Sequence, residues 1–191
     1  MGLVVLGAAL VISGCARTAP PSTSPAVPVF SSAPAGAGME RTVPDNCGDV
    51  ATLDELTHYL NNLVTGAVRP IIGVPQSNIG RTARIDCYYG VPAGQPIAKA
   101  KVWVGLASYA NEESARKRLT ATVADERTVG ATVSDVPVGP DRGVLIRNAN
   151  WMLVANRARV TVVVQVIPVL VREDHAGALL GQLADHALTN R

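Results

Sequence analysis

Aromatic residues and lysine are scarce in this chain of 191 residues. Phe, Trp and Tyr together make up 4% of it, and of the 17 basic residues only Lys99, Lys101 and Lys117 are lysine. A formal net charge of +2 is too small to indicate a protein that binds nucleic acid through its phosphates. We therefore expect no nucleic-acid partner, and we attribute the preference for arginine to a GC-rich genome.

Long hydrophobic runs are also missing. The apolar run from Leu3 to Ile12 covers ten residues, about half of the roughly 20 that a membrane-spanning helix needs. A run of this length and position is typical of a signal peptide. It ends in Ile12-Ser13-Gly14-Cys15, which has the form of a lipobox. The sequence therefore predicts that residues 1–14 are removed and that the Cys15 thiolate receives a diacylglycerol, with palmitate-type chains, to become the anchored first residue.

Two alternatives for this segment stay open: an ordinary secretory signal, and a buried N-terminal strand that happens to contain a cysteine. No Lys or Arg precedes the apolar run, although signal peptides begin with positive charge, so we expect the true start to lie upstream of Met1. The Met1-Gly2 opening is not a myristoylation signal, because position 6 is Leu6 rather than Ser or Thr.

Residues 15–44 are rich in Pro, Ser and Thr and contain Phe30 as their only aromatic residue. Such a segment buries too little apolar area to offset the entropy of ordering, so it is predicted to be a disordered linker. A flexible chain of this length spans roughly 30 Å. Its composition also resembles an O-glycosylated stalk. The remaining residues, 45–191, are enough for one ordinary hydrophobic core and are predicted to form a single domain.

Only three cysteines are present. If Cys15 carries lipid, Cys47 and Cys87 are the remaining thiols in an oxidising compartment, and we expect a disulfide between them. The alternative, a redox or metal pair, has little support because the chain has no C-x-x-C motif and no histidine near these cysteines.

The hydrophobic periodicity predicts three helices and several strands. Thr52 and Glu55 form a capping box that opens the first helix, which Gly66 would end. Residues 70–75 are either a short edge strand or a loop. Strands are expected at 85–91, 99–107, 144–147, 151–155 and 160–167, and further helices at 111–126 and 173–188. This order indicates an α+β fold, a twisted antiparallel sheet with helices packed mainly on one face.

Catalytic and metal-binding motifs are absent from the sequence. His175 and His186 lie 11 residues apart on one predicted helix, about 16 Å along its axis, and are predicted to be surface residues. The acidic pairs 54–55, 112–113 and 173–174 each fall in the first turn of a predicted helix, where the helix dipole explains them. We expect no enzyme activity, no metal and no cofactor.

Two features indicate binding surfaces. Lys101 and Trp103 project from the polar face of their strand and Trp151 begins another strand, so these three residues are a candidate ligand face. The alternative is that both tryptophans pack under a helix. Arginines also gather near the predicted hairpin ends, where they would meet acidic headgroups or an acidic partner, or else form a solvated edge that resists strand pairing. These are Arg142, Arg147, Arg157 and Arg159.

The lipobox, the Pro/Ser/Thr linker, the cysteine ahead of a helix and the strand with Cys87-Tyr88-Tyr89 together resemble the small envelope lipoproteins of actinobacteria, called Lpp, Lpq and Lpr in mycobacteria. The ending is similar too, where the segment 133–137 leads to paired strands, a Val-rich strand and an Ala/Leu helix. The resemblance implies an α+β domain of unknown function on the outer face of the cytoplasmic membrane, with no catalytic residues to carry over.

These observations predict a membrane-anchored, non-enzymatic binding or accessory module that meets an envelope protein or ligand. One alternative is an envelope hydrolase with a site assembled from distant residues, for which Ser108, Asp135 and His175 are candidates by residue type. Another is a lipid or glycolipid carrier, which requires an enclosed apolar cavity.

Overall fold

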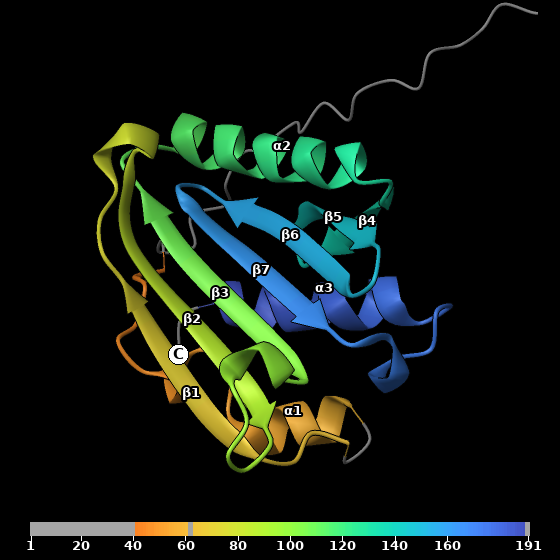
Figure 1. Cartoon of the computed structure of the whole chain (residues 1–191). Coiled ribbons are helices and arrows are strands. Elements are labelled where there is room, and N and C mark those ends of the chain that lie inside the picture. The colour runs from red at the N-terminus through yellow and green to blue at the C-terminus, as the bar shows by residue number, and fades with distance from the viewer. Residues whose placement is uncertain (1–40, 61–62, 190–191) are drawn as a thin grey trace, which may run out of the picture.

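The computed structural model describes residues 41–60 and 63–189. Its centre is an antiparallel sheet of seven strands in the order β1-β2-β3-β7-β6-β5-β4 (Figure 1). The strands are Ala67–Gly73 (β1), Arg81–Val91 (β2), Val102–Tyr109 (β3), Thr132–Val138 (β4), Asp141–Arg147 (β5), Trp151–Arg157 (β6) and Val160–Val166 (β7). Strands β4 to β7 form an antiparallel meander, in which β5, β6 and β7 correspond to the strands expected at 144–147, 151–155 and 160–167, and β7 then pairs with β3 in the middle of the sheet.

Three α-helices in the described part of the chain cover the sheet: Leu53–Tyr59 (α1), Glu112–Thr128 (α2) and Ala176–Leu188 (α3). Helices α1 and α3 share one large core with the first face, to which Leu56 and Leu180 contribute fully buried side chains. Helix α2 packs on the opposite face, where Leu119 and Val123 meet β5 and β6. The predicted α+β class is confirmed, with two of these three helices on one face.

The alternation of side chains along the central strands creates these two faces. In β7, Val160, Val162, Val164 and Val166 all belong to the core under α1 and α3, whereas Thr161, Val163 and Gln165 face α2, because successive residues of a strand point to opposite sides. Strand β3 follows the same rule, with Val104 on the first face and Trp103 on the second.

Helix α1 begins as predicted and ends early. The capping box is present, with the Thr52 hydroxyl accepting from the Glu55 amide at 3.2 Å and the Glu55 carboxylate accepting from the Thr52 amide at 2.8 Å. The helix ends at Tyr59 rather than near Gly66, so the prediction was too long. A tertiary contact holds the chain beyond it, since Lys101 Nζ donates to the Leu63 carbonyl at 2.7 Å.

The ambiguous segment around Pro70 is an edge strand. Pro70 lies in β1, paired on one side with β2 only, and an edge strand tolerates proline because its missing N–H is not needed there. Ile71 and Ile72 are exposed on this edge.

Helix α3 begins at Ala176, three residues after the predicted start. The placement of Glu173 and Asp174 in a first helical turn was therefore wrong, and Asp174 instead pairs with Arg172 at 2.8 Å in the preceding turn. The other two acidic pairs do lie in first turns, at Asp54–Glu55 and Glu112–Glu113.

The segment before α1 is fastened to the sheet by a disulfide. Cys47 and Cys87 are bonded, with Cα atoms 5.6 Å apart, and Tyr89 donates its hydroxyl to the Cys47 carbonyl at 3.1 Å. Arg41 is also buried and donates to the carbonyls of Asp49 and Thr189. Packing therefore begins before residue 45, where the domain boundary was predicted.

Cys15 and most of the predicted linker lie outside the described residues. Within residues 41–60 and 63–189, none of the helices has the length and apolar character needed to cross a bilayer.

Candidate functional site

The face of the sheet beneath α2 carries a patch of polar and aromatic side chains that α2 only partly covers. Strand pairing sets them in three rows across β2, β3 and β7. The rows are Tyr88, Trp103 and Gln165; Asp86, Gly105 and Val163; and Arg84, Ala107 and Thr161.

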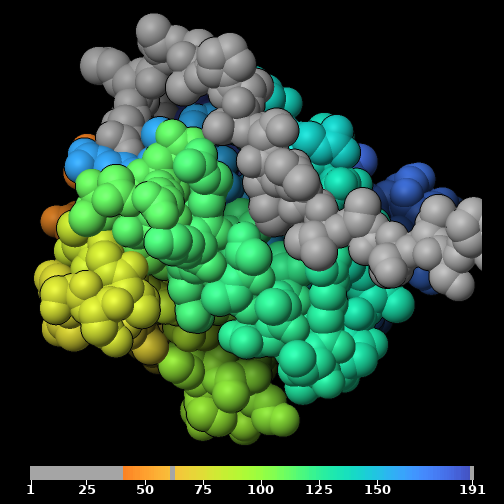
Figure 2. All heavy atoms as spheres, turned by 90° about the horizontal axis from the view of Figure 1, so that it is seen from above, coloured from red at the N-terminus to blue at the C-terminus, as the bar shows by residue number. Residues whose placement is uncertain are grey.

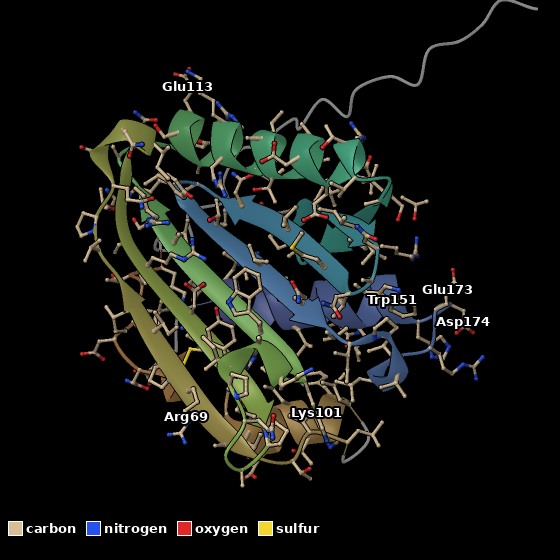
Figure 3. All side chains as sticks on the ribbon, in the orientation of Figure 1. Arg69, Lys101, Glu113, Trp151, Glu173 and Asp174 are labelled. Carbon is tan, nitrogen blue, oxygen red and sulfur yellow. A yellow bond between two sulfur atoms is a disulfide. The ribbon has the colours of Figure 1, made fainter. Side chains whose placement is uncertain are left out.

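Helix α2 crosses this face at an angle and forms a roof over part of it (Figure 1). Asn111 caps its start, accepting from the Ser114 amide at 2.9 Å, and Ala115 packs near the end of β3. Seen from above, the green and teal side chains of α2 form the middle of the molecular surface (Figure 2). Glu113 points away from the sheet on this helix (Figure 3).

A groove lies between the roof and the sheet. Its volume is about 220 Å³, and the polar residues that line it, apart from Trp103 and Tyr109 of β3, come from β2, β7 and α2. These are Arg84, Asp86, Arg118, Thr122, Glu126, Thr161 and Gln165. A side pocket of about 80 Å³ adjoins it, lined in part by Tyr88, Ile97 and Lys101, and the two share Trp103 and Gln165 as lining residues. Trp103 and Gln165 therefore border both cavities.

Asp86 is the centre of the groove floor. It is only 6% exposed. Its Oδ2 accepts from Arg84 Nε at 2.6 Å, and its Oδ1 accepts from Arg84 Nη2 at 2.9 Å and from Trp103 Nε1 at 3.0 Å. The hydrogen bond to Asp86 raises the pKa of the Arg84 guanidinium above its ordinary value. The fork of Arg84 therefore holds the carboxylate of Asp86 in one orientation beside the indole.

Trp103 lies along the sheet over Gly105. A Cβ built on Gly105 would be 3.3 Å from Trp103 Cζ2, 3.4 Å from its Nε1 and 2.8 Å from Asp86 Oδ1. The ring of Tyr88 runs parallel to the indole, with centroids 6.1 Å apart and an angle of 9°. Burial raises the pKa of the Tyr88 phenol, and the Asp86 carboxylate acts in the same direction. Gly105 thus makes room for both the indole and its carboxylate acceptor.

Replacing Gly105 by Ala is expected to lower the free energy of unfolding by about 1–3 kcal/mol, the usual cost of overpacking. It should also break the hydrogen bond from Trp103 to Asp86, because the new methyl group occupies their space. Urea denaturation measures the first effect and the shift of indole emission the second. In a Trp103→Leu background the cost of Gly105→Ala should shrink by more than about 0.5 kcal/mol; equal costs in the two backgrounds would show that the indole is not the group displaced.

The three residues of the predicted ligand face do not all come together. Trp103 and Lys101 both line the side pocket, although the Lys101 ammonium is bonded to Leu63 and Thr65. Trp151 aligns with Val166 and packs against the core of α1 and α3. Figure 3 shows Trp151 well apart from Lys101, near α3. The structure thus puts the two tryptophans on opposite faces of the sheet, and Trp151 does not belong to the groove.

The residue types proposed for a hydrolase are not assembled either. Ser108 lies in β3 and Asp135 in β4, with three strands between them in the sheet, a separation of about 19 Å at the usual strand spacing. His175 is exposed just before α3, 3.7 Å from Asp174. None of the described residues forms a group of three or more His, Cys, Asp and Glu side chains fit for a metal.

The predicted arginine cluster is largely engaged with neighbouring side chains. Arg157 donates to Asp141 at 2.6 Å and to Asp185 at 2.8 Å, so it ties α3 to the β5–β6 end of the sheet. Arg142 pairs with Asp135 at 3.8 Å, and Arg147 donates to the Ser134 hydroxyl at 3.5 Å. Arg159 is exposed at the β6–β7 turn.

Neither Asp86 nor Arg84 was among the predicted site residues. Arg84 and Asp86 carry opposite charges and are two residues apart in β2, so their side chains lie on the same face of the sheet. Tyr88, two residues further on, lies on that face as well. The pattern did not stand out because the strand was predicted to begin at Ile85, whereas β2 begins at Arg81.

No family model matches the chain, and no curated protein matches it. Among solved structures, the extracellular domain of PknH from Mycobacterium tuberculosis is similar, with 13% sequence identity and a TM-score of 0.46. The match covers 78% of this chain and 98% of that one.

Proposed function

We propose that this protein is a non-enzymatic binding module of the cell envelope, anchored on the outer face of the cytoplasmic membrane by lipid on Cys15, which takes a small ligand into the groove between α2 and the sheet. The observation that carries the proposal is the Asp86 cluster. It brings a nearly buried carboxylate, a guanidinium and an indole together on the floor of an open groove.

A purely structural role accounts poorly for this cluster. Taking a charge pair out of water is costly, and well-packed apolar residues often give equal or better stability in its place. The same sheet face elsewhere is filled by Val144, Ile146 and Val154, so an apolar solution was available. A charged cluster at the bottom of a groove is instead typical of sites in which a few polar groups orient a ligand.

Other groove side chains are also ready for a ligand. Gln165 lines both the groove and the side pocket. Its side-chain amide forms no hydrogen bond with another described residue. Arg118 and Glu126 project from α2 over the groove, and neither forms an ion pair with another described residue. Binding a ligand would give these groups partners that folding does not supply.

The disulfide supports an extracytoplasmic compartment, since such bonds persist in oxidising surroundings. Anchoring at the membrane rests on the lipobox alone. The groove supports a small ligand better than a lipid carrier, because its floor is charged and its volume of about 220 Å³ is below the roughly 300–1,000 Å³ of pockets for drug-sized ligands.

Photo-crosslinking from α2 tests whether the groove is occupied in the cell. With a benzoylphenylalanine at position 122, which lines the groove, irradiation of intact cells should add a small molecule to the full chain, seen as a mass gain below that of any protein. Thr120 is exposed on the same helix and lies outside the groove, so the same probe at position 120 is the matched control.

A small adduct at position 122 that is absent at position 120 would support the proposal. No adduct at position 122, equal labelling at both positions, or adducts of protein size at position 122 would contradict a small-ligand groove.

A further inference from the structure

We propose that the ligand of the groove is a neutral saccharide, with one sugar ring on the indole of Trp103 and its hydroxyls on Asp86 and Arg84. This inference rests on the proposed function of the groove and adds the chemical class of its ligand.

The charges of the groove floor balance, which argues against a charged ligand. Both oxygens of Asp86 are bonded to the Arg84 fork, so an anion would find no unpaired cation there and a cation would find a carboxylate already neutralised. On the roof, Arg118 and Glu126 carry one charge of each sign, so the groove lining as a whole has no excess of either sign. A neutral ligand matches this zero net charge.

The hydrogen-bonding groups left over suit hydroxyls. An ionised carboxylate accepts about four hydrogen bonds and a guanidinium donates five. Asp86 uses three of its positions, including the bond from Trp103, and Arg84 uses two of its N–H groups on Asp86. One acceptor position of Asp86 therefore remains beside three N–H groups of Arg84. The side-chain amide of Gln165 adds a further acceptor and further donors on the groove floor. A hydroxyl both donates and accepts, so adjacent hydroxyls on one ring can satisfy such a pair of groups.

The same floor disfavours a wholly apolar ligand. Covering Asp86, Arg84 and Gln165 with hydrocarbon would remove water from these groups without replacing its hydrogen bonds, which is costly. The apolar lining of the groove includes the indole of Trp103 together with Val163, Leu119, Met152 and Val154. A sugar ring has polar hydroxyls at its edge and C–H groups on its faces, and those C–H groups pack well on an aromatic face.

The volumes of the groove and the side pocket suit one sugar ring and part of a second ring. The groove holds about 220 Å³ and the side pocket about 80 Å³, with Trp103 between them. A ring in the groove would contact the indole on its Asp86 side, and a linked residue would pass Gln165 toward Tyr88. A disaccharide should therefore bind more tightly than its monosaccharide.

Fluorescence of Trp103 provides a direct test. The chain has two tryptophans, and Trp151→Phe leaves Trp103 as the only one, with Trp151 on the far face. The full chain with Trp151→Phe is titrated with methyl glucoside, methyl mannoside, methyl galactoside and methyl N-acetylglucosaminide, with matching disaccharides, and with glucuronate and glucosamine as charged controls. At least one neutral glycoside should shift the emission saturably, with a Kd of the order of 1 mM for about twelve non-hydrogen atoms.

Asp86→Asn separates a specific site from surface adsorption. The amide keeps the shape of Asp86 but replaces one of its oxygens with a donor, so the Arg84 fork is broken and the affinity for the neutral glycoside should fall at least tenfold. Glu113→Gln is the matched control, because Glu113 is exposed on α2 outside the groove, and it should leave the Kd unchanged. Equal loss in both variants would overturn the assignment.

A second experiment distinguishes two sources of the saccharide, a soluble sugar and the headgroup of a glycolipid. Phosphatidylcholine vesicles with and without a glycosyl diacylglycerol are titrated against the same protein, and an emission shift with the glycolipid alone assigns the headgroup as the source. A flat titration with every neutral glycoside and with the glycolipid, or tighter binding of glucuronate or glucosamine, overturns the saccharide inference. The groove's proposed function would survive that result if crosslinking at position 122 still captured another small molecule.

Discussion

The double variant Cys47→Ser with Cys87→Ser is expected to lose about 4 kcal/mol of unfolding free energy. The bond closes a loop with a sequence separation of 40 residues, and in the chain-entropy model a loop of this length restricts the unfolded chain by about that amount. Both cysteines are buried, Cys87 completely, so each serine also leaves a hydroxyl in an apolar site, which adds to the loss. Urea denaturation of the two proteins at the same pH measures the difference.

Reduction of the wild-type disulfide is the matching control, because it removes the cross-link without changing any residue. It should account for most of the loss in the double variant, with the remainder assigned to the buried hydroxyls. The link between these segments is not wholly abolished, since Tyr89 still donates to the Cys47 carbonyl. A loss below about 1 kcal/mol on reduction would show that the cross-link contributes little.

Cys15→Ala is expected to move the protein entirely from the membrane fraction to the soluble fraction. Of the described residues, no helical segment has the length and apolar character to hold the chain in a bilayer, and the thiolate of Cys15 is the proposed acceptor of the diacylglycerol. Each buried CH₂ of a lipid anchor contributes about 0.8 kcal/mol, so the loss of two acyl chains removes most of the affinity for the membrane. Fractionation with detergent partitioning and intact mass measures both the location and the missing lipid.

Cys47→Ser is the control for this experiment, because it removes a thiol in the folded domain and leaves the lipobox intact. It should stay in the membrane fraction and keep the mass of the lipid. Unchanged partitioning and unchanged mass in Cys15→Ala would contradict a lipid anchor and leave an ordinary secretory signal or a buried N-terminal strand as the role of this segment.

Local patterns predicted most of the elements correctly. The Thr52–Glu55 capping box and the alternating valines from Val160 to Val166 are short-range signals, since they depend on the 3.6-residue and two-residue periods of helix and strand. The errors concern the ends of helices and strands, because tertiary contacts determine where an element begins and ends. Helix α1 ends early, at Tyr59, and Lys101 donates a hydrogen bond to the chain just beyond it. Likewise, neither the length of β2 nor its pairing with β1 follows from the residues of β2 alone.

Three features could be predicted from the residues alone: the α+β class, the expected disulfide between Cys47 and Cys87, and the side of each strand on which a residue lies. These follow from local periodicity and from the small number of cysteines. How those sides combine into the faces of one sheet could not be predicted in this way, because the strand order and register are set by contacts between residues far apart in the chain. The register of β2 against β3 places Asp86 opposite Gly105 and so under the indole of Trp103, while the register of β6 against β7 turns Trp151 to the other face. The groove exists because α2, joined to β3 by a short turn, crosses that face and covers only part of it.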